Sequence, residues 1–232
     1  MLLKEFSLGS TILVDKPLNW TSFDVVNKIR WNLKQRLGIK KIKVGHAGTL
    51  DPLASGLLVL CIGKHTKLIN DIMIGEKTYT GTILLGKTTP SYDLESEFDK
   101  EYPTDHITEE MLKEITQSFL GEQLQTPPIF SAKKIGGKRA YELAREGVEV
   151  KMKQNTVNIY SFSIDTKKFP EIDFEICCSK GTYIRSIAND FGEKLNSGGT
   201  LIVLRRTQSG AQKITDAKTV DEWVSIIESA DL

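Results

Sequence analysis

Residues 45–56 read Gly-His-Ala-Gly-Thr-Leu-Asp-Pro-Leu-Ala-Ser-Gly, and this stretch carries the strongest signal in the chain. Glycine lets a backbone take positive φ and approach a ligand closely, and Pro52 fixes the chain directly after Asp51. Neither a metal-ligand spacing nor a second acid lies close by in the sequence. The stretch therefore predicts a rigid loop that presents one carboxylate, Asp51, and one imidazole, His46.

Strand and helix patterns alternate on both sides of this loop. Apolar runs or period-two alternation predict strands at 11–14, 57–62, 78–85, 156–164, 172–178 and 200–207. Capping signals and helical spacing predict helices at 21–37, 108–120 and 184–195, and from 219 towards the end. Several strands alternate as antiparallel strands do. We therefore expect one α+β domain over residues 1–232, with a mixed, mostly antiparallel central sheet flanked by helices.

The composition is that of a globular chain of 232 residues, with 40% hydrophobic residues and a formal net charge of +1. This balance argues against a disordered chain and gives no global attraction to nucleic acid. Any basic surface must be local. Basic residues cluster at 34–43, at 133–139 and at Arg205–Arg206, where an ordinary solvated surface is the alternative interpretation.

An insertion is expected at residues 121–150. It contains Thr126-Pro127-Pro128 and Gly136-Gly137, with basic residues between and after them, and a short helix is expected at 141–146. We interpret the segment as a mobile basic arm. The alternative is a surface loop followed by a helix.

The chain has three cysteines, Cys61, Cys177 and Cys178. Because their number is odd and two of them are adjacent, they argue against a disulfide framework and favour a reducing cytosol. The N-terminus lacks a signal-peptide core, and apolar runs are too short for a membrane span. We therefore expect a cytoplasmic protein that does not enter a membrane.

A reactive centre can be assembled from Asp51, Tyr79, Arg185, Tyr183 and His46. An arginine near Asp51 would keep the carboxylate ionised for nucleophilic or electrostatic work, and tyrosines could stack on a planar ligand. Each residue also has a structural interpretation, because an aspartate before proline is usually a turn residue. Phosphate-loop, dinucleotide, zinc and nucleophile-elbow motifs are missing from the sequence.

Motifs in collinear order carry a resemblance to one known family. The 45–56 stretch resembles the catalytic loop of TruB-type tRNA pseudouridine synthases. The other matching segments are Val14-Asp15-Lys16-Pro17, Lys77-Thr78-Tyr79, Gly181-Thr182-Tyr183-Ile184-Arg185, Leu204-Arg205-Arg206-Thr207 and the insertion around 127–141. Asn19 stands where the family usually has glycine, and asparagine tolerates positive φ better than most residues.

The resemblance implies the pseudouridine synthase fold with an RNA-gripping insertion, or thumb, at 121–150. It implies isomerisation of uridine 55 in the tRNA T-loop to pseudouridine after base flipping, without cofactor or metal. Asp51 would be the nucleophile, with Arg185 pairing with it and Tyr79 stacking on the base. The other residues carried over are the pocket residues His46, Tyr183 and Leu204 and the RNA-backbone candidates Lys133, Lys134, Lys138 and Arg139.

The resemblance also implies tRNA, through its T-stem-loop, as the partner, with no obligatory protein partner. Many bacterial members carry a further C-terminal RNA-binding, PUA-like module, which we expect to be absent here because the sequence stops at Leu232. A rival interpretation is an RNA chaperone, a role that can coexist with catalysis. A nucleoside or glycoside hydrolase usually needs two carboxylates. A guide-RNA-dependent synthase shares similar motifs, but the extensions expected for that machinery are missing.

Overall fold

The computed structural model describes residues 3–131, 133–135, 137–140 and 152–231. The chain forms two compact units, which we call the terminal unit (residues 1–79 and 204–232) and the middle unit (residues 80–203). The boundaries fall inside two strands, β4 (Lys77–Leu85) and β12 (Gly199–Ser209), so each strand contributes residues to both units.

The terminal unit is built on a mixed sheet around the buried strand β3 (Ala54–Gly63). Strand β1 (Gly9–Lys16) and strand β2 (Val44–His46) pair with β3 in antiparallel fashion, and β12 pairs with it in parallel. Two short strands complete the sheet, β14 (Lys218–Thr219) beside β1 and β13 (Gln212–Lys213) beside β12. The apolar run at 57–62 is a buried strand, as predicted.

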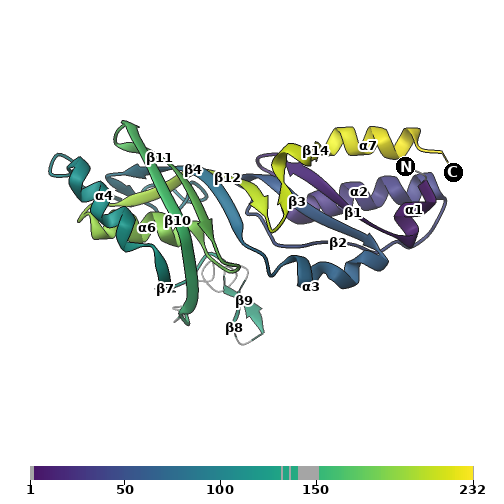
Figure 1. Cartoon of the computed structure of the whole chain (residues 1–232), viewed down its shortest axis with the longest axis horizontal. Helices are drawn as coiled ribbons and strands as arrows, with labels where there is room; N and C mark the ends of the chain where they lie inside the picture. Colours follow the sequence, from purple (N-terminus) through teal and green to yellow (C-terminus); the bar gives the residue numbers. More distant parts are fainter. Residues whose placement is uncertain (1–2, 132, 136, 141–151, 232) are drawn as a thin grey trace. The chain divides into compact units, whose positions relative to one another are not determined.

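Two helices, α2 (Ser22–Leu37) and α7 (Val220–Ser229), lie side by side in this unit (Figure 1). Each begins with the predicted capping box, Thr21 with Asp24 and Thr219 with Glu222. Their apolar faces bury the core against β1 and β3. The short helix α1 (Leu3–Leu8) was not predicted, although Leu3 and Phe6 are fully buried in the same core.

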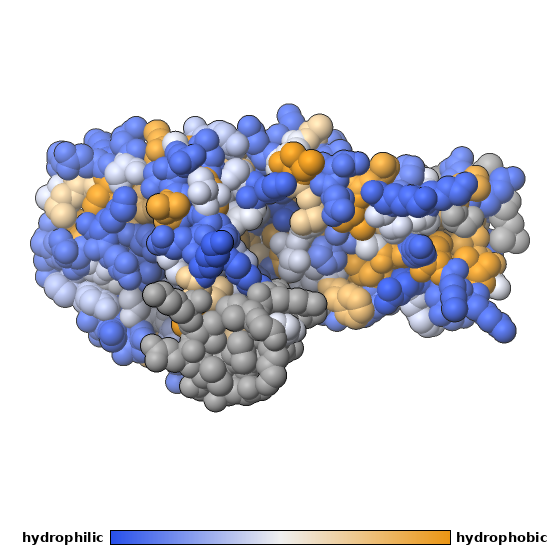
Figure 2. Space-filling view, turned by 90° about the horizontal axis from the view of Figure 1, so that it is seen from below, coloured by the Kyte–Doolittle hydropathy of each residue, from blue (hydrophilic) through white to orange (hydrophobic). Residues whose placement is uncertain are grey.

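After β3 the chain forms two short helices, η1 (Lys64–Leu68) and α3 (Ile69–Ile72). Leu68, Met73 and Ile74 are exposed there. Figure 2 shows apolar side chains gathered over this part of the terminal unit. A second short turn, η2 (Ile214–Asp216), precedes β14.

The middle unit contains a sheet in the order β12, β4, β11, β10, β7. The strands added here are β11 (Glu171–Cys178), β10 (Asn155–Lys168) and the edge strand β7 (Gly121–Gln125), which pair in antiparallel fashion. Two small ladders lie outside this sheet, β5 (Lys87–Thr88) with β6 (Lys100–Glu101) and β8 (Lys134–Ile135) with β9 (Lys138–Arg139). The predicted mixed, mostly antiparallel sheet is confirmed.

Two helices, α4 (Glu109–Ser118) and α6 (Ile184–Lys194), belong to the middle unit. Phe162 on β10 lies 5.8 Å, centroid to centroid, from both Phe119 after α4 and Phe191 on α6. Edge-to-face rings at such distances stabilise a core beyond their buried area. The aromatic cluster therefore fixes both helices to the β10–β11 hairpin.

The insertion at 121–150 begins with a regular strand, β7, which the sequence analysis did not predict. The helix expected at 141–146 lies outside the described residues. In the described part of the chain, the three cysteines are free thiols, and no cluster of acidic, histidine or cysteine side chains is suited to a metal ion. The helices of that part are too short or too polar to cross a membrane.

Candidate active site

The loop that carries Asp51 is held by the backbone on both sides of the aspartate. The Ala54 amide donates to the Asp51 carbonyl at 3.1 Å, and the Asn19 amide donates to the Pro52 carbonyl at 2.9 Å. On the preceding side, the buried Ser22 hydroxyl accepts from the Leu50 amide at 2.8 Å and donates to the Leu50 carbonyl at 3.0 Å. These bonds support the predicted rigid loop, with the Asp51 side chain half-buried.

Glycine is required at Gly56, where the loop enters β3. Its φ is +103°, and a Cβ atom there would lie 2.3 Å from the Arg206 carbonyl oxygen. A side chain at this position would therefore be strained and would push β12 away. Across the parallel β3–β12 ladder, Leu204 pairs with Ala54, which places the predicted pocket residue Leu204 beside the end of the loop.

Arg206 supports the loop through hydrogen bonds to two backbone carbonyls. Its side chain is 1% exposed, and it donates from Nε to the Leu57 carbonyl at 2.8 Å and from Nη2 to the Gly48 carbonyl at 3.1 Å. The neighbouring Arg205 makes a two-bond pair with Asp15, at 2.6 and 3.1 Å. Of the basic cluster noted at Arg205–Arg206, Arg206 is therefore buried and not part of a basic surface, while Arg205 is 38% exposed and paired with Asp15.

Lys16 brings a buried positive charge close to Asp51 within the terminal unit. Its ammonium donates to the Trp20 carbonyl at 2.6 Å and to the Pro17 carbonyl at 2.9 Å, and it lies 3.5 Å from the Pro52 carbonyl. Burial lowers the pKa of Lys16 to about 8, against the opposing effect of Asp51. The group is still mainly protonated at pH 7. Lys16 is a functional candidate that sequence reasoning missed, although it lies in the Val14-Asp15-Lys16-Pro17 motif.

His46 ends β2 and is half-buried. Burial, followed by the charge of Arg206, lowers the pKa of His46 below its ordinary value. The imidazole is therefore neutral at pH 7. A neutral ring of this kind suits packing or hydrogen bonding to an RNA base better than binding to phosphate.

The lowered pKa of His46 predicts a pH dependence of stability. Below about pH 6.5 the unfolded chain binds a proton at this residue more readily than the folded chain does. The free energy of unfolding should therefore fall as the pH drops below 6.5, and His46→Gln should make this fall smaller. Urea unfolding of wild type and His46→Gln at pH 8 and pH 5.5 measures how far the free energy of unfolding falls with pH in each protein. An equal fall in the two proteins would contradict the lowered pKa of His46.

Tyr79 is 9% exposed and is the last residue of the terminal unit on β4. The preceding residues fix this strand. The buried Lys77 ammonium donates to the Met73 carbonyl at 2.6 Å and to the Gly75 carbonyl, and Thr207 donates to the Thr78 carbonyl at 3.3 Å. The Tyr79 backbone is therefore well anchored, as an aromatic side chain that stacks on a ligand would need.

Arg185 is the second residue of α6 in the middle unit and is 4% exposed. Its Nη1 donates to the Ser91 carbonyl at 3.2 Å, and its Nε lies 3.5 Å from the Asp93 carboxylate, which is an ion-pair distance. The Asp93 carbonyl accepts from Thr89 at 2.7 Å, so the acid itself is held by its own turn. Sequence reasoning missed Asp93, which no spacing linked to Arg185.

The pairing of Arg185 with Asp51 stays a prediction, since Asp51 belongs to the terminal unit and Arg185 to the middle unit. The structure does confirm that Tyr183 and Arg185 stand at the start of a helix after Gly181. The Tyr183 amide donates to the Gln125 side-chain oxygen at 2.7 Å, and the Gln125 amide nitrogen donates back to the Tyr183 carbonyl at 3.0 Å. The side chain of Gln125 thus satisfies both backbone polar groups of Tyr183.

The basic residues of the insertion differ in how they are placed. The Lys133 ammonium donates to the Lys153 carbonyl at 3.0 Å and to Asn155 Oδ1 at 2.9 Å, so it ties the insertion to the start of β10. Lys134 pairs with Arg139 in the β8–β9 hairpin, beside Lys138. The hairpin therefore brings the three remaining candidates close together along the backbone.

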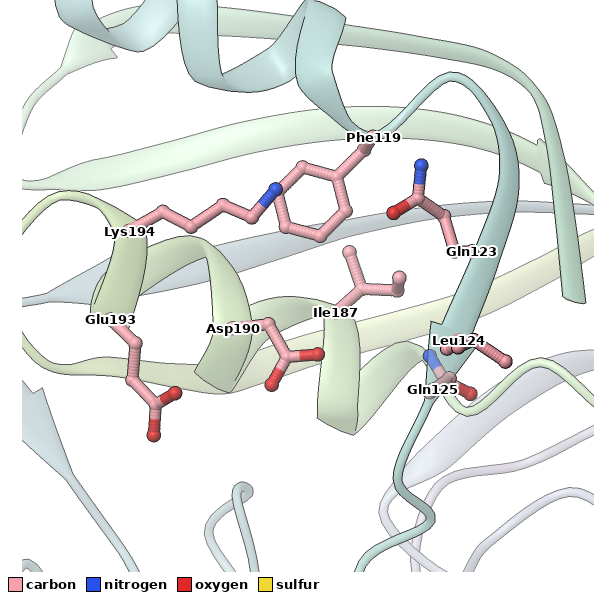
Figure 3. Close-up of a pocket in the computed structure, with 8 residues that line it drawn as sticks. All are labelled: Phe119, Gln123, Leu124, Gln125, Ile187, Asp190, Glu193 and Lys194. Carbon is pink, nitrogen blue, oxygen red and sulfur yellow. The ribbon is translucent and has the colours of Figure 1, made fainter. Parts of the chain in front are cut away.

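The middle unit also has a groove of about 370 Å³ between β7 and α6 (Figure 3). Lys194 covers one end, with its ammonium 4.5 Å from the centroid of Phe119 and 2.9 Å from Ser118 Oγ. Burial raises the pKa of Asp190 on the same wall. The residues that line the groove do not include any predicted site residue.

Residues 34–184 match the family described as TruB family pseudouridylate synthase (N terminal domain). The chain belongs to this family. Two similar proteins are both named tRNA pseudouridine synthase B. The protein of Phocaeicola vulgatus is 51% identical over 222 residues, covering 94% of each chain. The protein of Flavobacterium johnsoniae is 51% identical over 215 residues, covering 92% of this chain and 94% of the relative.

A similar solved structure supports the fold. A chain in a Cbf5–Nop10–Gar1 complex is 26% identical and superposes with a TM-score of 0.72. The match covers 97% of this chain and 56% of that one, so the TruB-family chain spans about half the length of that neighbour. The predicted pseudouridine synthase fold is therefore confirmed.

Proposed function

We propose that this TruB-family protein isomerises uridine 55 in the T-loop of tRNA to pseudouridine, with Asp51 as the nucleophile. The observation that carries the proposal is the Asp51 loop, which is fixed by backbone bonds on both sides and has the buried Lys16 ammonium close to it. Relatives 51% identical over nearly their whole length are named tRNA pseudouridine synthase B.

The reaction breaks the bond between N1 of uracil and C1′ of the ribose and joins C5 to C1′. The base must turn within the pocket, and the hydrogen on C5 must leave as a proton. Asp51 would attack the ribose or the base, or assist elimination. The substrate and the product are isomers, so the chemistry itself calls for neither a cofactor nor an energy source.

Other residues would hold the extruded nucleotide. Extrusion costs a few kcal/mol, and stacking of the base on an aromatic side chain offsets part of that cost. Tyr79 would supply this stacking, while His46, Tyr183 and Leu204 would shape the pocket. Arg185, already oriented by Asp93, would hold Asp51 ionised. The cytoplasm, where tRNA is modified, is the proposed location.

The test is release of tritium from C5 of uridine. Unmodified tRNA carrying tritiated uridine is incubated with the protein, and the label released to water is counted. Wild-type protein should release label stoichiometrically with one uridine per tRNA, because C5 loses its hydrogen once it binds C1′. A protein that binds tRNA without releasing label would instead be an RNA chaperone, the rival role.

The insertion supplies a prediction about RNA binding. Replacing Lys133, Lys134 and Lys138 by Ala should weaken tRNA binding and flatten its salt dependence, because each lost phosphate contact lowers the slope of log K against log salt by about 0.7 to 0.9. Fluorescence anisotropy over a salt series measures the slope.

Because Lys133 also bonds within the protein, a Lys134→Ala/Lys138→Ala variant that keeps Lys133 tests the charge of the hairpin without removing those bonds. A triple variant with the wild-type slope would refute the assignment of these lysines to phosphate contacts.

A further inference from the structure

Helix α2 has an outward face that its role in the core does not explain. Phe23 is 59% exposed and Trp31 is 57% exposed, and Leu18, just before the helix, is 55% exposed. Positions 23, 27, 31 and 34 follow helical spacing, so the two aromatic rings share one face with Asn27 and Lys34. Large aromatic side chains are uncommon at such exposure, and two on one face indicate an interaction surface.

Most charged residues of α2 are basic, and Asp24, next to Phe23, is the acidic exception. Every charged residue from position 25 to position 43 is basic, although the whole chain carries a net charge of only +1. The Arg30 guanidinium lies 5.6 Å from the centroid of the Phe23 ring. Arg36 is not counted among the groups open to a ligand, because it donates to the Glu228 and Ala230 carbonyls and so fixes the end of α7. Lys28, Arg30 and Lys34 remain as the basic groups of α2 that are available to an anionic ligand.

A hollow at the start of α2 links this face to the Asp51 loop. It has a volume of about 440 Å³ and is lined by Asn19, Trp20, Asp24, Asn27 and Lys28. The amide of Asn19 is bonded to the carbonyl of Pro52, the residue after Asp51. An indole and two side-chain amides are suited to the face and the edge of a nucleobase. The hollow and the aromatic face thus form one path that starts beside the loop, within the terminal unit.

We propose that this path, from Asn19 along α2 to Lys34, binds unpaired nucleotides of the RNA substrate outside the uridine pocket. Bases would stack on Trp31 and Phe23, while Lys28, Arg30 and Lys34 contact phosphates. Alternation of aromatic rings with cations is the arrangement that binds single strands without reading their sequence. An acidic protein segment would use the cations but would not require two exposed rings. The proposal rests on the proposed function only in taking tRNA as the natural ligand.

The test uses a short oligocytidine, which is unpaired and contains no uridine to isomerise. The variant Phe23→Ala/Trp31→Ala should bind it about tenfold more weakly than wild type, and Trp31→Phe should bind nearly as well as wild type because the ring is kept. Binding should quench the tryptophan fluorescence of the protein, and Trp31→Phe should show less quenching, because Trp20 in the hollow is the remaining indole on the path. With full-length tRNA, the double variant should raise KM much more than it lowers kcat.

Leu68→Ala/Ile74→Ala is the matched control, since it removes two exposed apolar side chains of the same unit away from α2. It should bind oligocytidine and release tritium as wild type does. Equal binding of oligocytidine by wild type and Phe23→Ala/Trp31→Ala would overturn the proposal, and so would equal affinity for a fully paired RNA duplex. Polyglutamate that competes as well as RNA would show a general polyanion surface and would also overturn it. Failure of the proposed function would show instead as no tritium release by wild type.

Discussion

Asp51→Asn is expected to abolish turnover, with a loss on the order of 10⁴-fold or more in kcat, the scale seen when a nucleophile is removed. Asparagine has the size of aspartate but carries no charge and is a poor nucleophile. The loop should survive the change, because the bond that Ala54 donates to residue 51 ends on a backbone carbonyl. Tritium release from C5 of uridine in unmodified tRNA, under single-turnover conditions, measures the effect.

Two controls distinguish a loss of catalysis from a loss of RNA binding or of folding. The variant should bind tRNA within a few-fold of the wild-type affinity, and its urea unfolding should be close to that of wild type. Tritium release by the variant at a rate near that of wild type would overturn the role of Asp51 as nucleophile. Loss of binding together with loss of release would assign Asp51 to RNA binding instead.

Asp93→Asn is expected to have the largest effect on stability. The Arg185 and Asp93 side chains are 5% and 7% exposed, and removal of one partner from such a buried pair costs about 3–5 kcal/mol, because the other charge stays buried without compensation. Arg185 should also lose its fixed orientation, so kcat should fall in the fraction that remains folded. Urea unfolding and tritium release at a temperature where the variant is folded measure the two effects.

Asp165→Asn is the matched control in the same unit. Asp165 pairs with Lys167 at 2.9 Å, but the side chains are 49% and 86% exposed, so the loss of stability should be far smaller than for Asp93→Asn. An Asp93→Asn variant as stable as Asp165→Asn would show that the buried pair does not hold Arg185 in place. Unchanged kcat in a destabilised variant would remove Asp93 from the support of catalysis while leaving its structural role.

Local patterns made much of this fold predictable. Capping boxes at Thr21 and Thr219 mark helix starts because a side chain and a backbone amide three residues apart satisfy each other. The apolar run before Gly63 predicts a strand because both faces of β3 are covered. The glycines and Pro52 predict a stiff loop around Asp51, because these residue types restrict or permit backbone angles that others do not.

Contacts between distant segments could not be predicted in the same way. The burial of Arg206 depends on two carbonyls that lie 149 and 158 residues away in the chain, on either side of Asp51. The pairing of Arg185 with Asp93 joins a helix start to a polar turn with no shared pattern. Strand β7 has too few apolar residues to show alternation, and it forms because β10 offers it an edge.

The isomerisation of one uridine of the tRNA T-loop to pseudouridine is the activity that we propose for this protein. Its most direct test is to map pseudouridine along an unmodified tRNA transcript, by carbodiimide labelling and primer extension, after incubation with the purified chain alone. One modified position is expected, uridine 55, and it should be absent when Asp51→Asn replaces wild type. Modification at another position, or none in a transcript that the protein demonstrably binds, would contradict the proposed activity.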